Sequence, residues 1–164
     1  MTYPDFDKDL YGIYKSEVMG EALFSTAALL SRGERRGKWR ALAALETQTR
    51  ERYLAYESGR GQCPAYPVSS RVGGYLFGLL FALCPWRTAM SMLKAGTPAF
   101  IEQFQRLVDH APPEDAPFFD YVLQHELAIT RFAEHEMAGK GDTLADVERL
   151  LSGTAIASAE GQHG

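Results

Sequence analysis

The chain has few cysteines and no strongly apolar opening. Its 164 residues include two cysteines, Cys63 and Cys84, too few for the disulfide framework of a small secreted domain. A single bridge between them remains open, but reduced thiols are the simpler interpretation. The first ten residues, "MTYPDFDKDL", are acidic and contain no apolar run, so they predict no signal peptide. We therefore expect a cytoplasmic protein.

Basic charge and the common catalytic motifs are also scarce. The net charge is −4 at pH 7, which argues against a nucleic-acid partner. The short basic run "GERRGKWR" is more typical of a solvated helix start. The sequence has no Gly-rich phosphate loop, no Cys/His spacing of a zinc site and no Gly-x-Ser-x-Gly motif. These three chemistries therefore have no support.

Alternating strand patterns are absent, whereas helical periodicity runs through the chain and predicts an all-α protein. We expect one helical domain over residues 1–151 and a small, polar, disordered tail over 152–164. The predicted helices cover residues 5–31, 34–58, an apolar segment at 72–93 divided by Pro85, 99–111, 118–139 and a short last helix before 151. Between them lie a polar hinge at 31–37, a loop rich in Gly and Pro at 58–67, and a kink or helix start at "GTP", residues 96–98.

Several glutamates fall inside the apolar stripes of these helices. In the helix over 118–139, Glu126 lies within roughly 60° of Phe119 on the helical wheel. The same periodicity turns Glu17 and Glu21 inward from the first helix and Glu46 inward from the second. His125 falls on a flank of its helix. A buried carboxylate is unfavourable unless it is protonated, paired with an Arg or Tyr, or bound to a metal ion.

Three segments resemble the ferritin-like superfamily, and more distantly its rubrerythrin-like and demethoxyubiquinone-hydroxylase-like members. "SEVMGEALFSTAALL" is similar to the first helix of such proteins, "ALAALETQTRERYL" to the second and "LQHELAITRFAEHE" to the fourth. The resemblance implies a four-helix bundle with a long crossover between its second and third helices. It also implies a site for two iron or manganese ions, with Glu21, Glu46 and Glu126 as ligands.

The sequence departs from the family pattern at the histidines. That pattern repeats Glu-x-x-His, but Thr49 and Ile129 stand where the histidines are expected. The third long helix offers only Glu102, which is predicted to face solvent. Glu17 and His125 are therefore added as candidate metal ligands. The neighbouring candidates that could pair with or orient the acids are Arg50, Tyr14 and Tyr53.

Three functions remain open. The first is a non-heme diiron oxidase or hydroxylase that acts on a small apolar molecule. The second is a metal-free binding or assembly module in which the inward acids pair with Arg50 or tyrosines. The third is a peripheral membrane protein that uses residues 72–93, whose twelve uncharged residues from 72 to 83 are too short to span a bilayer. A buried crossover helix is the simpler interpretation of that segment, and we expect a homo-oligomer.

Overall fold

Residues 3–160 fold into six helices. The computed structural model describes residues 3–160, and side chains through residue 153. The helices are α1 (Phe6–Leu30), α2 (Gly33–Gly59), α3 (Val68–Leu83), α4 (Trp86–His110), α5 (Ala116–Ala138) and α6 (Ala145–Glu160). No strand occurs in this part of the chain, which confirms the all-α prediction.

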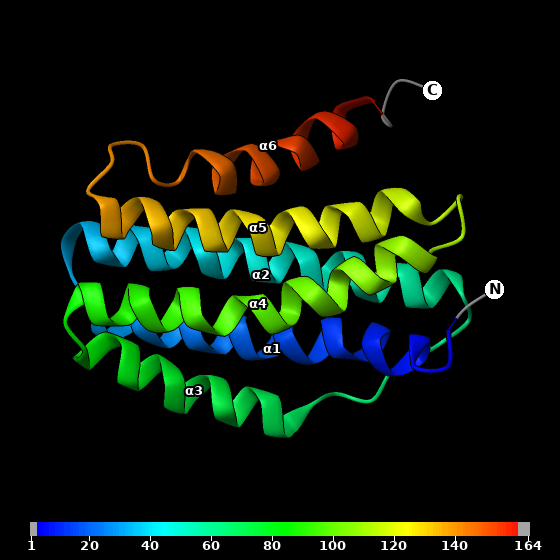
Figure 1. Ribbon diagram of the computed structural model, residues 1–164, viewed down its shortest axis with the longest axis horizontal. Coiled ribbons are helices and arrows are strands. Elements are labelled where there is room, and N and C mark those ends of the chain that lie inside the picture. Colours follow the sequence, from blue (N-terminus) through cyan, green and yellow to red (C-terminus); the bar gives the residue numbers. More distant parts are fainter. Residues whose placement is uncertain (1–2, 161–164) are drawn as a thin grey trace.

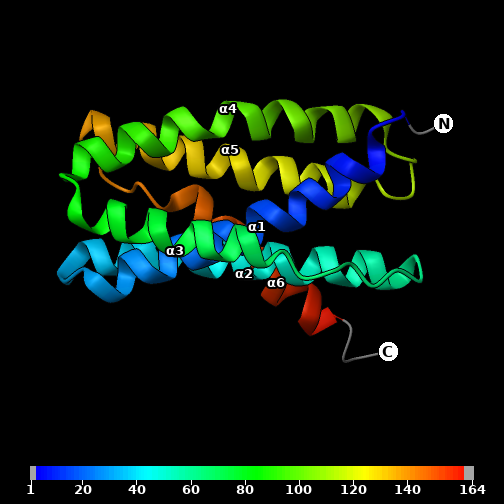
Figure 2. The ribbon, with the colours of Figure 1, turned by 90° about the horizontal axis from the view of Figure 1, so that it is seen from below.

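Two helical hairpins form the body of the molecule. Helix α1 packs against α2, and α4 packs against α5, while α6 covers α2 and α5 (Figure 1). Helices α2 and α4 run in the same direction, so the chain between them must return along the bundle. Helix α3 lies in this return segment and packs beside α1, and Figure 2 shows it in front of α1 when seen from below.

The helix ends differ from the expected positions at three points. The hinge is only two residues long, because α2 already begins at Gly33, whose φ of 57° accommodates the sharp turn. Pro98 lies inside α4 and starts no new helix. Helix α6 continues to Glu160, into the segment where the tail was predicted; residues 161–164 of that tail lie outside the described residues.

Two other breaks fall where the sequence predicted them. Pro85 separates α3 from α4 because it fixes its own φ and provides no backbone N–H. Gly139 ends α5 with a φ of 65°, a left-handed conformation that glycine adopts without strain.

Glycines bring α3 close to α1. A Cβ atom on Gly74 would lie 2.3 Å from the carbonyl oxygen of Met19, and one on Gly78 would lie 2.5 Å from that of Leu23. Gly73 faces no such neighbour. Helix α3 is thus a packed crossover on one side only, because much of its other side is exposed. Among the described residues, no helix is long and apolar enough to cross a membrane.

The interior contains two hydrophobic clusters with a polar layer between them. One cluster is centred on Phe24, Trp39 and Phe132. The other includes Tyr53, Phe104, Phe119 and further side chains from α1, α4 and α5. On α5 the first group of buried apolar residues ends at Leu123 and the next begins at Ala128. His125 and Glu126 occupy the gap.

Candidate metal centre

Three helices contribute to the polar layer at the centre of the bundle. Glu17 comes from α1, Glu46 and Thr49 from α2, and His125 and Glu126 from α5. Glu17 and His125 are each only 1% exposed, and Glu46 and Glu126 are 5% and 6% exposed. The apolar stripes of these helices turn the glutamates inward, as the periodicity predicted.

Glu17, Glu46 and His125 form a group that could hold a metal ion. One ligand atom from each lies within 4.8 Å of the other two. The Nε2 atom of His125 is 3.6 Å from Oε2 of Glu46, and its Nδ1 atom is 3.7 Å from Oε2 of Glu17. Ligand atoms about 2 Å from a common ion lie about 3–4 Å apart, so the Nε2–Glu46 distance suits a shared ion, and Glu17 offers its ligand atom within 4.8 Å of the other two.

Two atoms of this group are buried without a hydrogen-bond partner, Oε2 of Glu17 and Nε2 of His125. Buried polar atoms normally have partners, because an unsatisfied one loses its hydration without compensation. Both atoms can donate an electron pair to a metal ion. The donor set therefore fits a cation.

Thr49 determines which nitrogen of His125 is available. The Thr49 hydroxyl is 3.0 Å from the Leu45 carbonyl oxygen, to which it donates, and 2.5 Å from Nδ1 of His125. Because the Thr49 O–H points at the Leu45 carbonyl oxygen, the hydroxyl oxygen accepts a hydrogen bond from Nδ1–H of His125. That tautomer leaves the lone pair on Nε2, the nitrogen beside Glu46. Thr49 stands where the family pattern has histidine, and here it orients a histidine from α5.

Gly20 makes room for Glu46. A Cβ atom at position 20 would lie 2.4 Å from the carboxyl carbon of Glu46. Only glycine on α1 allows this carboxylate to lie against the helix backbone. Sequence reasoning missed this role, because it assigned a function in this segment to the acids Glu17 and Glu21 and none to Gly20.

The electrostatics of the layer disfavour charged carboxylates in the absence of a cation. Burial raises the pKa of Glu17 well above its ordinary value, and the neighbouring Glu46 and Glu126 raise it further. Burial also raises the pKa of Glu126, with a further contribution from Glu46. Desolvation and like charges both favour the neutral acid, so a proton or a bound cation must relieve this repulsion.

Glu21, the α1 ligand implied by the family resemblance, has a different environment. Its Oε2 atom accepts a hydrogen bond of 2.7 Å from Nε of Arg50, and Arg71 lies 3.8 Å from its other oxygen. It is absent from the group of three possible ligands. The structure thus places Glu17, one turn earlier on α1, beside His125 and Glu46.

The other candidates lie away from the group. Tyr14 and Tyr53 stack on each other with ring centroids 5.1 Å apart, in the cluster around Phe119. The side chain of Glu102 is 80% exposed and pairs with Arg106, as its position on the helical wheel predicted. His125 was expected on a flank, but it is buried because that flank of α5 faces α2 as well as α1.

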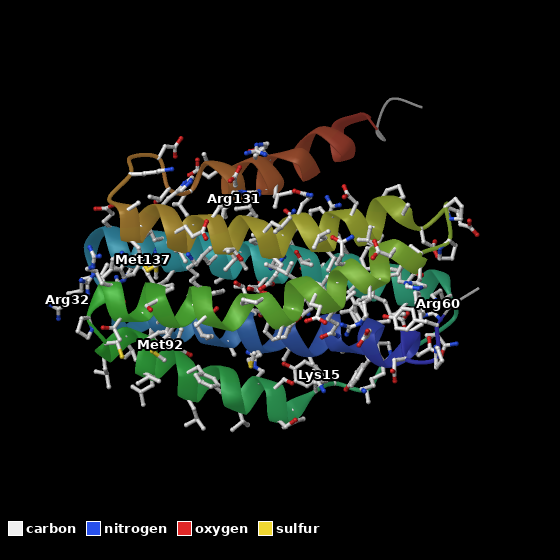
Figure 3. The ribbon with its side chains drawn as sticks, in the orientation of Figure 1. Lys15, Arg32, Arg60, Met92, Arg131 and Met137 are labelled. Carbon is white, nitrogen blue, oxygen red and sulfur yellow. The ribbon has the colours of Figure 1, made fainter. Side chains whose placement is uncertain are left out.

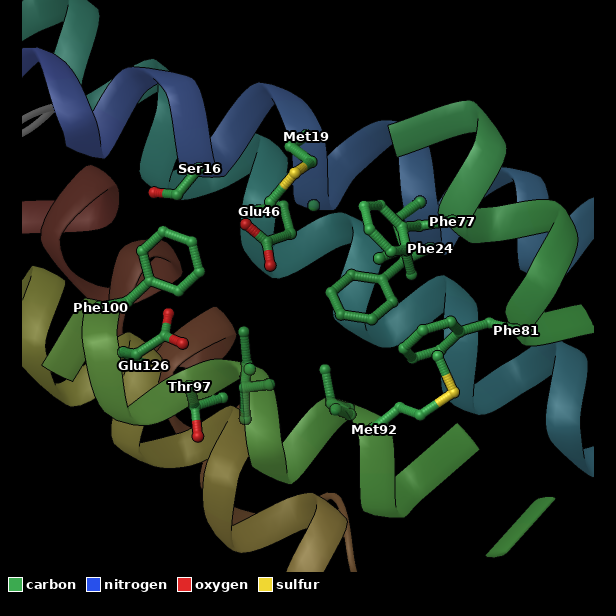
Figure 4. A pocket seen from close by; sticks show the side chains of 15 residues that line it. Ser16, Met19, Phe24, Glu46, Phe77, Phe81, Met92, Thr97, Phe100 and Glu126 are labelled. Atoms are coloured by element: carbon green, nitrogen blue, oxygen red, sulfur yellow. The ribbon is translucent and has the colours of Figure 1, made fainter. Parts of the chain in front are cut away.

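A cavity of about 190 Å³ adjoins the polar layer. Figure 4 shows Glu46 and Glu126 directed toward it from two sides, with aromatic side chains around the remaining space. Its apolar walls come from α1, α3, α4 and α5: Met19, Leu23, Phe24, Phe77, Phe81, Met92, Leu93, Phe100 and Ile129. Ser16 and Thr97 are the only other polar side chains in its lining.

Comparisons with models of protein families, with curated proteins and with solved structures found no match to this chain.

Proposed function

We propose that the polar layer binds iron or manganese and that the protein is an oxidase or hydroxylase acting on a small apolar molecule. The observation that carries the proposal is the pair of buried atoms without partners, Oε2 of Glu17 and Nε2 of His125. Both atoms belong to the group of Glu17, Glu46 and His125, and among the described residues this is the one group of Glu, Asp, Cys and His side chains close enough together to share a metal ion. A metal ion would give both atoms a partner and offset the carboxylate repulsion.

Nε2 of His125 and the carboxylates of Glu17 and Glu46 would hold the first ion. Glu126 adds a fourth donor group, close enough to Glu46 for the charge of Glu46 to raise its pKa, and Glu46 and Glu126 would contribute to holding a second ion. Oxygen and imidazole ligands suit iron, manganese and zinc, whereas thiolates are absent from the group. Of the three metals, iron and manganese have the redox chemistry that an oxidase needs.

The order of the helices supports a ferritin-like bundle. A hairpin, a long return segment and a second hairpin form the connectivity of that fold. In this chain the ligands would be shifted relative to the family pattern: Glu17 in place of Glu21 on α1, and His125 on α5 in place of a histidine on α2. Fold likeness alone establishes no activity, so the proposal depends on the site.

The cavity supports an apolar substrate. Its lining has four phenylalanines and two methionines, and its polar groups gather beside the proposed ions. A bound redox metal supplies the oxidising chemistry. The protein's own groups would exclude water and orient the molecule beside the carboxylates of Glu46 and Glu126.

A metal-free binding module is the second candidate, and one contact favours it. Arg50 pairs with Glu21 at 2.7 Å, the kind of pairing that such a module requires. In that case Glu17 and Glu126 would be neutral, as their raised pKa values allow. The cavity would then bind its ligand without chemistry.

Metal analysis of wild type and three matched variants tests the proposal. Protein purified without chelator is expected to contain iron or manganese at about one ion or more per chain. Glu17→Gln and Glu46→Gln should each lower the metal affinity by roughly tenfold or more, and with it the metal content, since even groups behind the ligands change affinity by that much. Glu21→Gln is the control, on the same helix and one turn from Glu17, and it should keep the metal. A wild type without metal, or a loss confined to Glu21→Gln, would refute the proposed site.

A further inference from the structure

Helix α3 has a packed face and an apolar face that no described residue covers. Gly74, Gly78 and Phe81 are buried on the inner side. The outer side exposes five large aliphatic side chains: Val72 (52% exposed), Leu76 (66%), Leu79 (46%), Leu80 (42%) and Leu83 (76%). Figure 3 shows side chains projecting from α3 away from the other helices. Contiguous apolar surface of this kind indicates an interaction site.

The patch extends beyond α3 at both of its ends. Tyr66 and Val68 are exposed at its start, and Leu29 and Leu30 are exposed at the end of α1, which runs in the same direction as α3. Because α3 lies along α1 rather than projecting from it, the apolar side chains form one elongated surface. Such a surface can lie flat on a partner.

The segment that carries this surface has charges of one sign only, and the nearby Glu21 of α1, which lies 3.8 Å from Arg71, is paired with Arg50. The chain contains no Asp or Glu from residue 58 to residue 101, a stretch that includes Arg60, Arg71, Arg87 and Lys94. Arg71 lies in the first turn of α3, where it donates hydrogen bonds to the hydroxyls of Tyr66 and Tyr75. Arg87 is exposed in the first turn of α4, four residues after the end of α3. An arginine thus flanks each end of the apolar face.

This charge pattern argues against a second copy of the chain as the occupant. In a two-fold symmetric contact each patch meets the same patch of its partner. The segment that forms the patch has no carboxylate to meet Arg71 and Arg87 of the other copy, and the adjacent Glu21 is only 18% exposed and is already paired with Arg50. An anionic lipid surface meets both requirements, because its headgroups supply negative charge and its acyl chains accept the aliphatic side chains. Tyrosine rings such as those of Tyr66 and Tyr75 suit the boundary between the two.

We propose that the outer face of α3 docks on the surface of an anionic membrane. The helix would lie in the plane of the interface, with Val72, Leu76, Leu79 and Leu83 below the headgroups and Arg71 and Arg87 among the phosphates. Docking requires no metal, so its test is independent of the proposed oxidase function.

Co-sedimentation with vesicles tests the docking. Wild-type protein should bind vesicles of phosphatidylcholine with 30% phosphatidylserine, should bind pure phosphatidylcholine much more weakly, and should lose affinity as salt is added. The double variant Val72→Glu/Leu76→Glu should lower the partition coefficient on anionic vesicles by roughly tenfold or more. Ala55→Glu/Ser152→Glu adds the same charge at exposed positions on α2 and α6, and it should bind within about twofold of wild type.

A second variant keeps the test independent of any damage to α3. Arg87→Gln removes one cation outside that helix and should lower binding to anionic vesicles about fivefold. No binding of wild type to either vesicle would overturn the proposal, as would equal binding of all variants. Sedimentation velocity supplies the remaining outcome: a wild-type dimer that Val72→Glu/Leu76→Glu dissociates, without vesicle binding, would assign the face to a second copy instead.

Discussion

Two sets of buried acids differ in what lies next to them. Near the ends of the bundle each acid has a cation: Asp9 pairs with Arg106, Glu57 with Arg60 and Glu136 with Lys38. At the centre, Glu17 and Glu46 have only His125 within ion-pair distance, and Glu126 has no ion pair among the described residues. All are from one chain and similarly buried.

The paired acids near the bundle ends stabilise the metal-free fold, whereas the fold only tolerates the acids at the centre. Burial raises the pKa of Glu136, but hydrogen bonds from Lys38, Thr143 and Trp86 outweigh burial, so this pKa is lowered. The pKa values of Glu17 and Glu126 are raised, because burial and neighbouring acids act together. A fold that keeps unpaired acids at its centre needs protons or a cation there, and the proposed metal ion would supply that charge.

Removing the cation from a paired acid should have the largest effect on stability. Lys38→Met leaves Glu136, whose side chain is 7% exposed, without its cation. We expect a loss of about 3 kcal/mol in the free energy of unfolding, as for other broken buried pairs, measured by urea denaturation. Lys94→Met is the matched control, because its partner Glu134 is 44% exposed, and it should cost about 0.5 kcal/mol. Equal costs would remove the distinction between the paired buried acid and a surface acid.

Crowding the central layer should have a smaller effect on stability and a large one on metal. In Gly20→Ala the new Cβ would lie 2.4 Å from the Glu46 carboxyl carbon, so the carboxylate must move. We expect a cost of about 1–2 kcal/mol and a fall in metal content. Gly37→Ala, in an exposed part of α2 with nothing near its Cβ, should raise stability by about 0.5 kcal/mol. Full metal content in Gly20→Ala would show that Glu46 needs no room against α1.

Neutralising a central acid should stabilise the metal-free protein. Glu17→Gln keeps the shape and removes a charge that burial disfavours, so the chelator-treated variant should be about 1 kcal/mol more stable than wild type at neutral pH. Glu21→Gln removes the partner of Arg50 and should not stabilise. Thermal melts of the two metal-free variants measure this difference. A lower melting temperature for Glu17→Gln than for wild type would show that Glu17 stabilises the fold, as the paired acids do.

The two sets should also respond to pH in opposite directions. A carboxyl whose folded pKa is raised binds its proton more tightly in the folded state, so apo stability should fall as pH rises above 4.5, the ordinary value for Glu17 and Glu126. Glu136 has a lowered pKa, so its contribution is present above 4.5 and is lost as pH falls through its folded pKa. The melting temperature of the apo wild type should therefore fall between pH 4.5 and neutral pH. This fall should be smaller in Glu17→Gln.

The sequence predicted most of the helices, whereas the grouping of Glu17, Glu46 and His125 became visible only in the structure. Periodicity placed α1, α2 and α5 within two residues of their observed ends and turned Glu46 and Glu126 inward, because both features depend on residues of one helix. The roles of His125 and Gly20 depend on which helix lies opposite, and a single helical wheel carries no such information. For the same reason the choice between Glu17 and Glu21 required the position of Arg50.

Calorimetric titration of the chelator-treated protein with Mn²⁺ or anaerobic Fe²⁺, in buffers of different ionisation enthalpy, tests the central claim most directly. Because burial raises the pKa values of Glu17 and Glu126 and so favours their protonated forms without a cation, we predict stoichiometric binding with net release of about one proton or more per chain. The release should decrease in Glu126→Gln and remain unchanged in Glu21→Gln. Absence of binding, or binding without proton release, would contradict a metal centre at the buried acids.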